Sequence, residues 1–209
     1  MKLVIATPSP FARKARVALI EKRIAFDTEV DVPWNPDTQA PALNPLGKIP
    51  ILVLDDGRVI HDSKVIVEYL ETLGRPPPLL PPDPMLRVQH KQIEATADGV
   101  CDAVVLIVLE HSRSTGLQSV DWVARQRAKV EAGTRWLADV LGPSDWFVGG
   151  EFGLADIAVG CMLGYLDLRL PEFDWRAPHP GLRAFADNLF RRPSFLATVP
   201  QSQAIAPVR

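Results

Sequence analysis

The sequence predicts an α+β domain followed by an all-α, helical-bundle domain. Short apolar, β-branched runs alternate with helical patterns before residue 75. The segment RPPPLLPPDP at 75–84 holds too much proline for a helix or a central strand. Beyond it only helical periodicity is found. We therefore expect domains at 1–75 and 85–209, joined by a stiff Pro-rich linker at 76–84.

The first domain begins with a short buried strand. Residues 2–6 are apolar and β-branched, and Thr7-Pro8 ends the run. Ser9 then provides an N-cap hydroxyl and Pro10 suits the first helical position, so a helix is expected to about Arg23. Alternating residues at 26–32 predict a second strand, and the proline-rich stretch 33–45 predicts a loop with one helical turn.

A hairpin and a helix complete this domain. The Asp56-Gly57 pair separates apolar runs at 49–54 and 58–61, which is a strong signal for two antiparallel strands. Apolar residues at helical spacing follow over 65–73, and Gly74 ends the helix. The expected order is β-α-β-α-β-β-α. In the second domain, helices are expected at 86–111, 120–141, 154–170 and 182–189.

Composition excludes several classes of protein. A net charge of -2 argues against a nucleic-acid-binding protein. The longest apolar run, at 103–109, is far too short to span a membrane, and the N-terminal residues do not form a signal peptide. Two cysteines and four histidines show no metal-ligand spacing, so no metal is expected. Free thiols favour a reducing, cytoplasmic location.

Four segments together are similar to the glutathione S-transferase family. They are SPFARK at 9–14, NPLGKIP at 44–50, Asp62-Ser63, and GLADI at 153–157. The resemblance implies a thioredoxin-like first domain that binds glutathione as a co-substrate. It also implies a homodimer and a second, small hydrophobic electrophile as partners.

Ser9 is where the chemistry of a transferase is expected. A free thiol has a pKa of about 8.5, whereas the nucleophile is the thiolate. A hydroxyl that donates a hydrogen bond to sulfur, aided by a helix N-terminus, would lower that pKa. The alternative is that Ser9 only caps the helix, and Thr7 is a weaker candidate for the same hydroxyl. No Tyr or Cys precedes Tyr69, which disfavours a cysteine-based reductase.

The resemblance also implies a set of glutathione-binding residues. Ile49 and Pro50, expected to be joined by a cis bond, would pair with the peptide backbone of the ligand. Asp62 and Ser63 would hold its γ-glutamyl end, and Lys48 could reach its glycyl carboxylate. The alternatives are a plain turn, a helix N-cap and a surface lysine. Phe11 completes the implied set.

Other residues have weaker claims to a role in the site. Arg13 either supports the thiolate or is a solvated surface arginine. Trp34 either lines the site or the subunit interface, or it only packs. Asp156 is interpreted as a helix-capping, structural residue. Acidic residues at 94, 98 and 102 face either the site or a partner subunit, or they form a solvated stripe, which is favoured.

The resemblance favours a glutathione transferase, with two kinds of alternative. An isomerase, a reductive dehalogenase or a peroxidase would use the same bound thiolate on another substrate. A non-enzymatic binding or assembly module would use the fold without the chemistry.

Overall fold

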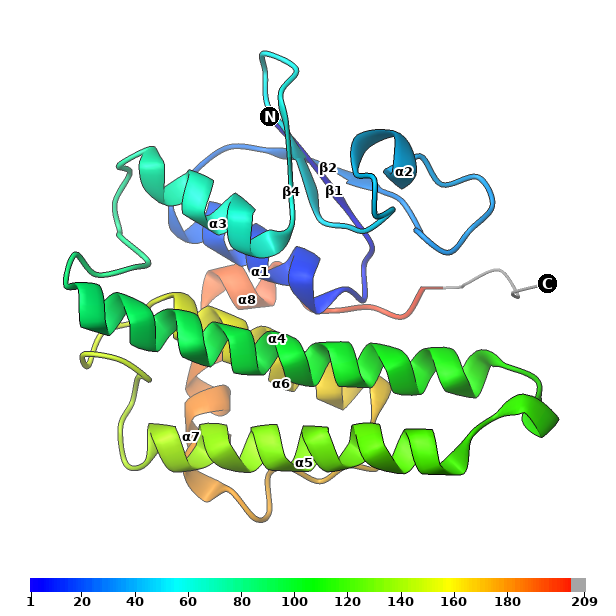
Figure 1. The fold of residues 1–209 in the computed structure, drawn as a ribbon. Coiled ribbons are helices and arrows are strands. Elements are labelled where there is room, and N and C mark those ends of the chain that lie inside the picture. Colours follow the sequence, from blue (N-terminus) through cyan, green and yellow to red (C-terminus); the bar gives the residue numbers. More distant parts are fainter. Residues whose placement is uncertain (204–209) are drawn as a thin grey trace. The chain divides into compact units, whose positions relative to one another are not determined.

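The computed structural model describes residues 1–203, which form two compact units. The first contains residues 1–80 together with 193–203, and the second contains residues 81–192. Figure 1 shows the elements of each unit, coloured along the chain. Residues 204–209, the end of the expected second domain, lie outside the described range.

A four-stranded mixed sheet forms the centre of the first unit. Its strands are β1 (Lys2–Ile5), β2 (Asp27–Val30), β3 (Ile51–Val53) and β4 (Val59–His61), in the spatial order β2-β1-β3-β4. β1 is parallel to β2 and antiparallel to β3, which is antiparallel to β4. The expected element order and the antiparallel hairpin are confirmed. β2 is shorter than expected and exposed throughout, because it lies at the edge of the sheet.

Helices cover both faces of this sheet. They are α1 (Pro10–Glu21), α2 (Ala40–Leu43) and α3 (Ser63–Thr72). Val4 and Ile51 form a buried cluster with Ala40 of α2. Successive strand residues face opposite sides, so the fully buried Leu3 points the other way. α1 and α3 pack against each other and against the strands, and Figure 1 shows them together on the side away from α2.

The proline-rich segment remains anchored to the first unit as far as residue 80. The buried Lys22 donates to Glu71 at 2.7 Å and to the carbonyls of Arg75 and Pro77 at 2.8 and 3.1 Å. Glu71 also accepts from the N–H of Leu79. A buried ammonium needs several acceptors, and the segment supplies two of them. The first unit therefore extends beyond the limit expected at residue 75.

The C-terminal segment, residues 193–203, also belongs to the first unit. It contains α8 (Pro193–Leu196), which packs on α1. The buried Arg13 donates to the carbonyl of Phe195 at 3.2 Å and lies 5.0 Å from the centre of its ring. The expectation that the helical domain would continue from 85 to the C-terminus differs from the structure here. The cause is a long-range contact that carries no local pattern.

Among the described residues, the regular elements of the second unit are all helices. Its helices are α4 (Pro84–Ser112), η1 (Thr115–Leu117), α5 (Val120–Leu141), α6 (Leu154–Arg169) and α7 (Pro180–Leu189). α4 packs against α5 and α6, and α7 packs against the same two helices. α6 is buried along most of its length and so forms the centre of this unit. Among the described residues, no helix is long and apolar enough to cross a membrane.

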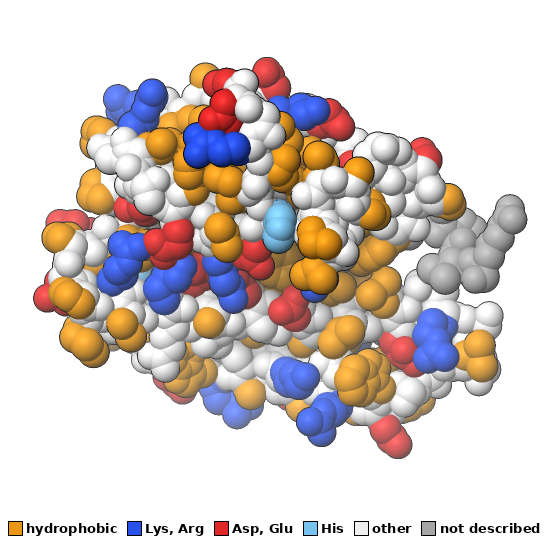
Figure 2. Space-filling model, turned by 45° about the horizontal axis from the view of Figure 1, so that its top comes forward, with side chains coloured by type: hydrophobic (Ala, Val, Ile, Leu, Met, Phe, Trp, Pro, Cys, Tyr) orange, Lys and Arg blue, Asp and Glu red, His pale blue; other side chains and the backbone are white. Residues whose placement is uncertain are grey.

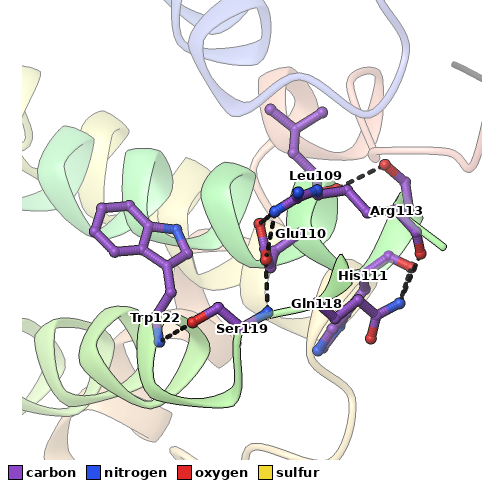
Figure 3. A network of polar contacts seen from close by, with 8 residues as sticks. Leu109, Glu110, His111, Arg113, Gln118, Ser119 and Trp122 are labelled. Atoms are coloured by element: carbon purple, nitrogen blue, oxygen red, sulfur yellow. Dashed lines mark hydrogen bonds and ion pairs between the residues drawn. The ribbon is translucent and has the colours of Figure 1, made fainter. Parts of the chain in front are cut away.

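A polar network fixes the connection between α4 and α5, as Figure 3 shows. The Glu110 carboxylate accepts from the Ser119 N–H at 2.7 Å and from Arg113 at 3.0 Å. These bonds hold the pKa of Glu110 below its usual value, and the bond from Ser119 has the largest effect. Gln118 donates to the carbonyl of Arg113 at 2.8 Å, and the Ser119 hydroxyl caps α5 by accepting from the Trp122 N–H. The turn between the two helices is thereby closed by side chains.

Candidate functional site

The sheet register brings the three expected glutathione-site segments to one edge of the first unit. Ser9 follows β1, Pro50 precedes β3, and Asp62 follows β4. The first residue of β3 pairs with the last residue of β4 and with the next-to-last residue of β1. Because β3 is antiparallel to both neighbours, its beginning lies between their ends. Segments from three distant parts of the sequence therefore lie side by side.

Ser9 occupies the N-cap of α1. Its backbone is extended, Pro10 takes the first helical position, and its Oγ accepts the Ala12 N–H at 3.2 Å. A hydroxyl has one hydrogen to donate, and within residues 1–203 that of Ser9 has no acceptor. Ser9 is half-buried. The cap and the thiolate contact are therefore compatible, because they use different parts of the same hydroxyl.

The Thr7 hydroxyl is engaged elsewhere. It donates to the carbonyl of Gln201 at 3.2 Å. A thiolate could take this hydrogen only if that bond were broken. Of the two hydroxyls considered, the geometry thus favours Ser9.

Phe11 and Arg13 follow in the first turn and a half of α1. Phe11 is half-buried, directly after Pro10. Arg13 is 4% exposed, so its interpretation as a solvated surface residue is wrong. Its guanidinium bonds to the Phe195 carbonyl and to the Thr198 hydroxyl. Arg13 thus fastens the C-terminal segment to the helix that carries Ser9.

Asn44 holds the loop before β3, a role that the sequence did not reveal. It is 3% exposed, donates to the Lys48 carbonyl at 2.7 Å and accepts from the Leu46 N–H at 3.0 Å. Gly47 has a φ of 59°, in the left-handed region that glycine adopts readily. The Asn-Pro-x-Gly order is a turn signal that could have suggested this role.

The Ile49–Pro50 bond is cis. The Ile49 side chain packs against the cluster of Val4, Ala40 and Ile51. Among the described residues, its N–H and C=O make no hydrogen bond, which leaves both for an added peptide strand. The Lys48 side chain before it is exposed.

Asp62 and Ser63 begin α3 with an unusual backbone. Asp62 has a φ of 71°, which is rare for a residue other than glycine. Its Oδ1 caps the helix by accepting from the Lys64 N–H at 2.8 Å, and its side chain is exposed. Ser63, the first helical residue, is buried. An exposed carboxylate thus lies beside a hydroxyl at a helix N-terminus.

The remaining candidates differ in burial and in their partners. Trp34, in the loop after β2, is 38% exposed. On α4, Glu94 and Asp98 are buried whereas Asp102 is exposed. Glu94 pairs with Lys91 at 2.6 Å. The interpretation of these acids as a solvated stripe is therefore wrong for Glu94 and Asp98, which are buried.

Asp156 caps α6 from inside the second unit. Its carboxylate accepts the N–H of Gly153 at 2.8 Å and that of Phe147 at 3.0 Å. Burial nevertheless raises its pKa to about 6. The buried His90 accepts the neighbouring Ala155 N–H through Nδ1 at 3.1 Å, and burial lowers its pKa to about 4. Sequence reasoning missed His90, since a lone histidine in an amphipathic helix gives no signal.

Comparisons with known proteins agree with this architecture. The family model of the glutathione S-transferase N-terminal domain matches residues 8–73, and that of the C-terminal domain matches 120–188. An uncharacterised GST-like protein of Escherichia coli K12, YibF, is 39% identical over 205 residues, covering 96% of this chain and 98% of that protein. The chain belongs to the glutathione S-transferase family.

Two solved glutathione S-transferase structures extend the comparison to bound ligands. That from Methylobacterium radiotolerans, a complex with glutathione sulfonate, is 47% identical with a TM-score of 0.96, covering 98% of this chain and 97% of the other. That from Methylobacillus flagellatus, with glutathione bound, is 43% identical with a TM-score of 0.90, covering 96% and 99%. This glutathione S-transferase family member therefore shares its thioredoxin-like and helical domains with glutathione-binding relatives.

Proposed function

We propose that the chain is a glutathione transferase in which Ser9 stabilises the thiolate of bound glutathione for attack on a small apolar electrophile. The Ser9 geometry carries the proposal. Its oxygen is held by the Ala12 N–H at 3.2 Å, so the hydroxyl is fixed while its hydrogen stays available. The positive end of the α1 dipole lies at the N-terminus of the helix, which Ser9 caps.

The required stabilisation is within reach of these groups. Lowering a thiol pKa by two units takes about 2.7 kcal/mol. A hydrogen bond to a charged group contributes about 1.5–3 kcal/mol, and a helix terminus adds about 0.3–1 kcal/mol. Ser9 and the N-terminus of α1 together can therefore supply it without a metal ion.

The rest of the edge suits the other parts of the tripeptide. The open N–H and C=O of Ile49 would pair with the cysteinyl unit, as in strand addition. The Asp62 carboxylate would bind the α-ammonium of the γ-glutamyl residue, and Ser63 with the α3 N-terminus would bind its α-carboxylate. The exposed Lys48 would meet the glycyl carboxylate. The glutathione-bound relatives support this assignment.

Glutathione affinity and conjugation, measured together, test the proposal. Wild type should bind glutathione, lower the pKa of its thiol and conjugate a halonitroaromatic probe. Ser9→Ala should bind glutathione but lose most of the turnover. Ser114→Ala is a matched control, because Ser114 is an exposed N-cap whose side chain accepts no capping bond. Full activity in Ser9→Ala would refute the proposed role of Ser9.

A glutathione-dependent isomerase is the second candidate. Maleylacetoacetate isomerase of Pseudomonas aeruginosa is 30% identical over 173 residues, covering 79% of this chain and 77% of that enzyme. An isomerase would return the thiolate unchanged, so glutathione would not be consumed. Conversion of a cis-enedione acid to its trans isomer, with no fall in the glutathione concentration, would favour this candidate. Binding without turnover of any electrophile, peroxide or haloarene would instead indicate a binding module.

Quaternary structure and location complete the proposal. We expect a homodimer, since the first unit exposes large apolar side chains such as Leu46 (71%) and Val65 (53%). Sedimentation equilibrium tests this.

Figure 2 shows side chains of both charge signs mixed on the face that it displays, as expected at a net charge of -2. Cys101 and Cys161 are buried and form no disulfide, which supports a cytoplasmic location that cell fractionation can check.

A further inference from the structure

The end of the described chain runs along the whole length of α1. The Ser194 hydroxyl donates to Glu21 at the C-terminal end of the helix. Arg16 donates to the Ala197 carbonyl at 3.2 Å in the middle. Beyond the other end of α1, Thr7 bonds to the last described residues. The segment therefore braces α1 and continues onto the loop that carries Ser9.

Every backbone and side-chain polar group of Thr7 bonds to this segment. The Thr7 N–H donates to Oε1 of Gln203 at 3.1 Å, and its hydroxyl donates to the Gln201 carbonyl at 3.2 Å. The Thr7 carbonyl accepts from the Gln201 N–H at 3.4 Å. Gln201 contributes through its backbone, whereas Gln203 contributes through its side-chain amide.

The loop has few other means of holding its shape. Pro8 and Pro10 have no N–H, so Thr7 and Ser9 carry the donors of the loop. The Ser9 N–H closes a turn onto the Ala6 carbonyl at 3.0 Å. Within residues 1–203 the Thr7 N–H has one acceptor, Gln203. Without it, a part-buried donor two residues before Ser9 would lose its bond, and the loop would loosen.

We propose that Gln203 is a positioning residue for the Ser9 hydroxyl, acting through Thr7. The inference rests on the proposed function, because Ser9 needs exact placement only if it donates to a thiolate. A hydrogen bond weakens steeply when its angle falls towards about 120°, so small rotations of the loop reduce the stabilisation of the sulfur. The C-terminal segment would thus tune the nucleophile through the loop that carries Ser9.

Three full-length variants test this role. Gln203→Ala removes the acceptor of the Thr7 N–H. Gln203→Glu keeps an acceptor oxygen at the same reach. Gln201→Ala is the matched control, because its exposed side chain makes no hydrogen bond among the described residues, while its backbone bonds stay intact. All three should unfold within a few degrees of wild type, since Arg13 and Arg16 still hold the segment.

Two measurements are made on each variant. Hydrogen exchange of the ligand-free protein reports on the loop, and the thiolate absorbance of bound glutathione against pH reports the thiol pKa. For Gln203→Ala we expect about tenfold faster exchange in the segment containing Thr7. Its bound-thiol pKa should rise by about 0.5–1 unit towards the free value of about 8.5. Gln201→Ala should match wild type in both, and Gln203→Glu should restore slow exchange.

The outcomes separate the two proposals. An unchanged hydrogen-exchange rate around Thr7 in Gln203→Ala would refute the claim that Gln203 holds this loop. Faster exchange with an unchanged thiol pKa, in a protein whose wild type lowers that pKa, would refute the positioning role alone. A wild-type protein whose bound thiol titrates as in free solution would refute the glutathione proposal itself, and the positioning role with it.

Discussion

The Oγ of Ser9 accepts a hydrogen bond from the backbone N–H of Ala12 at 3.2 Å, and so closes the first turn of α1. One hydroxyl therefore has a structural and a chemical part to play. The two can be separated, because alanine removes both while aspartate keeps only the cap. A carboxylate accepts from Ala12 as well as a hydroxyl does, but when ionised it has no hydrogen to donate to sulfur.

The first prediction concerns these two Ser9 variants. Ser9→Ala should lower the free energy of unfolding by about 1 kcal/mol, and Ser9→Asp should change it by less than about 0.5 kcal/mol. Both should lose the lowered thiol pKa and about ten- to a hundredfold in kcat/KM. Urea unfolding and thiolate absorbance measure the two effects. A Ser9→Asp variant that kept an active thiolate would contradict the hydrogen-bond mechanism.

The second prediction concerns Asn44, whose side chain makes two hydrogen bonds inside the loop before β3. Asn44→Ala should cost about 2 kcal/mol of stability, because the two backbone partners lose their bonds. It should raise KM for glutathione several-fold and leave kcat nearly unchanged, since Ser9 is untouched. Steady-state kinetics with varied glutathione test this. The exposed Asn188 provides the control variant, and an equal effect there would contradict a specific role.

The third prediction concerns the pH dependence due to Asp156. Burial raises its pKa from 3.8 to about 6, so the folded protein holds this proton more tightly than the unfolded chain. Its contribution to stability, of about 3 kcal/mol, is present below about pH 4 and is lost as the pH rises to about 6. Asp156→Asn abolishes this dependence and also loses one acceptor for the Gly153 or Phe147 N–H, which should cost about 1–2 kcal/mol at pH 7. Urea unfolding at several pH values measures both.

The fourth prediction concerns His90, whose pKa is shifted in the opposite direction to that of Asp156. Burial lowers its pKa from 6.5 to about 4. As the pH falls through this range the unfolded chain takes up the proton first, so stability is lost in acid. His90→Gln keeps an acceptor for the Ala155 N–H but does not titrate, and should lose less stability in acid than wild type.

The two substitutions in the second unit should therefore move acid stability in opposite directions. Asp156→Asn removes a term that favours the folded state in acid, so its loss of stability between about pH 6.5 and 4 should be steeper than that of wild type. His111→Gln, at an exposed position on the same helix as His90, is the control and should follow wild type. Parallel pH profiles for all variants would contradict both assignments.

Local patterns accounted for most of the first unit. The strand ends, the Asp-Gly hairpin and the Ser-Pro start of α1 depend on residues a few positions apart, so they could be predicted directly. The expected site segments could be placed on these elements. The burial of Asn44 could not be predicted, because a polar residue in a turn has the same local pattern whether it is buried or exposed. The burial of Glu94 and Asp98 was missed because helical spacing does not say what covers a face.

The sequence by itself determined the α+β and all-α halves, the order of their elements and the family motifs, because short-range sterics, capping and hydrophobic periodicity fix them. Only the tertiary structure decided that residues 193–203 return to α1, that Gln203 bonds to Thr7, and that the Ser9 hydrogen stays available while that of Thr7 does not. These are contacts between residues up to 196 positions apart. They arise from which buried donors find acceptors after the chain has folded, and no local pattern encodes that choice.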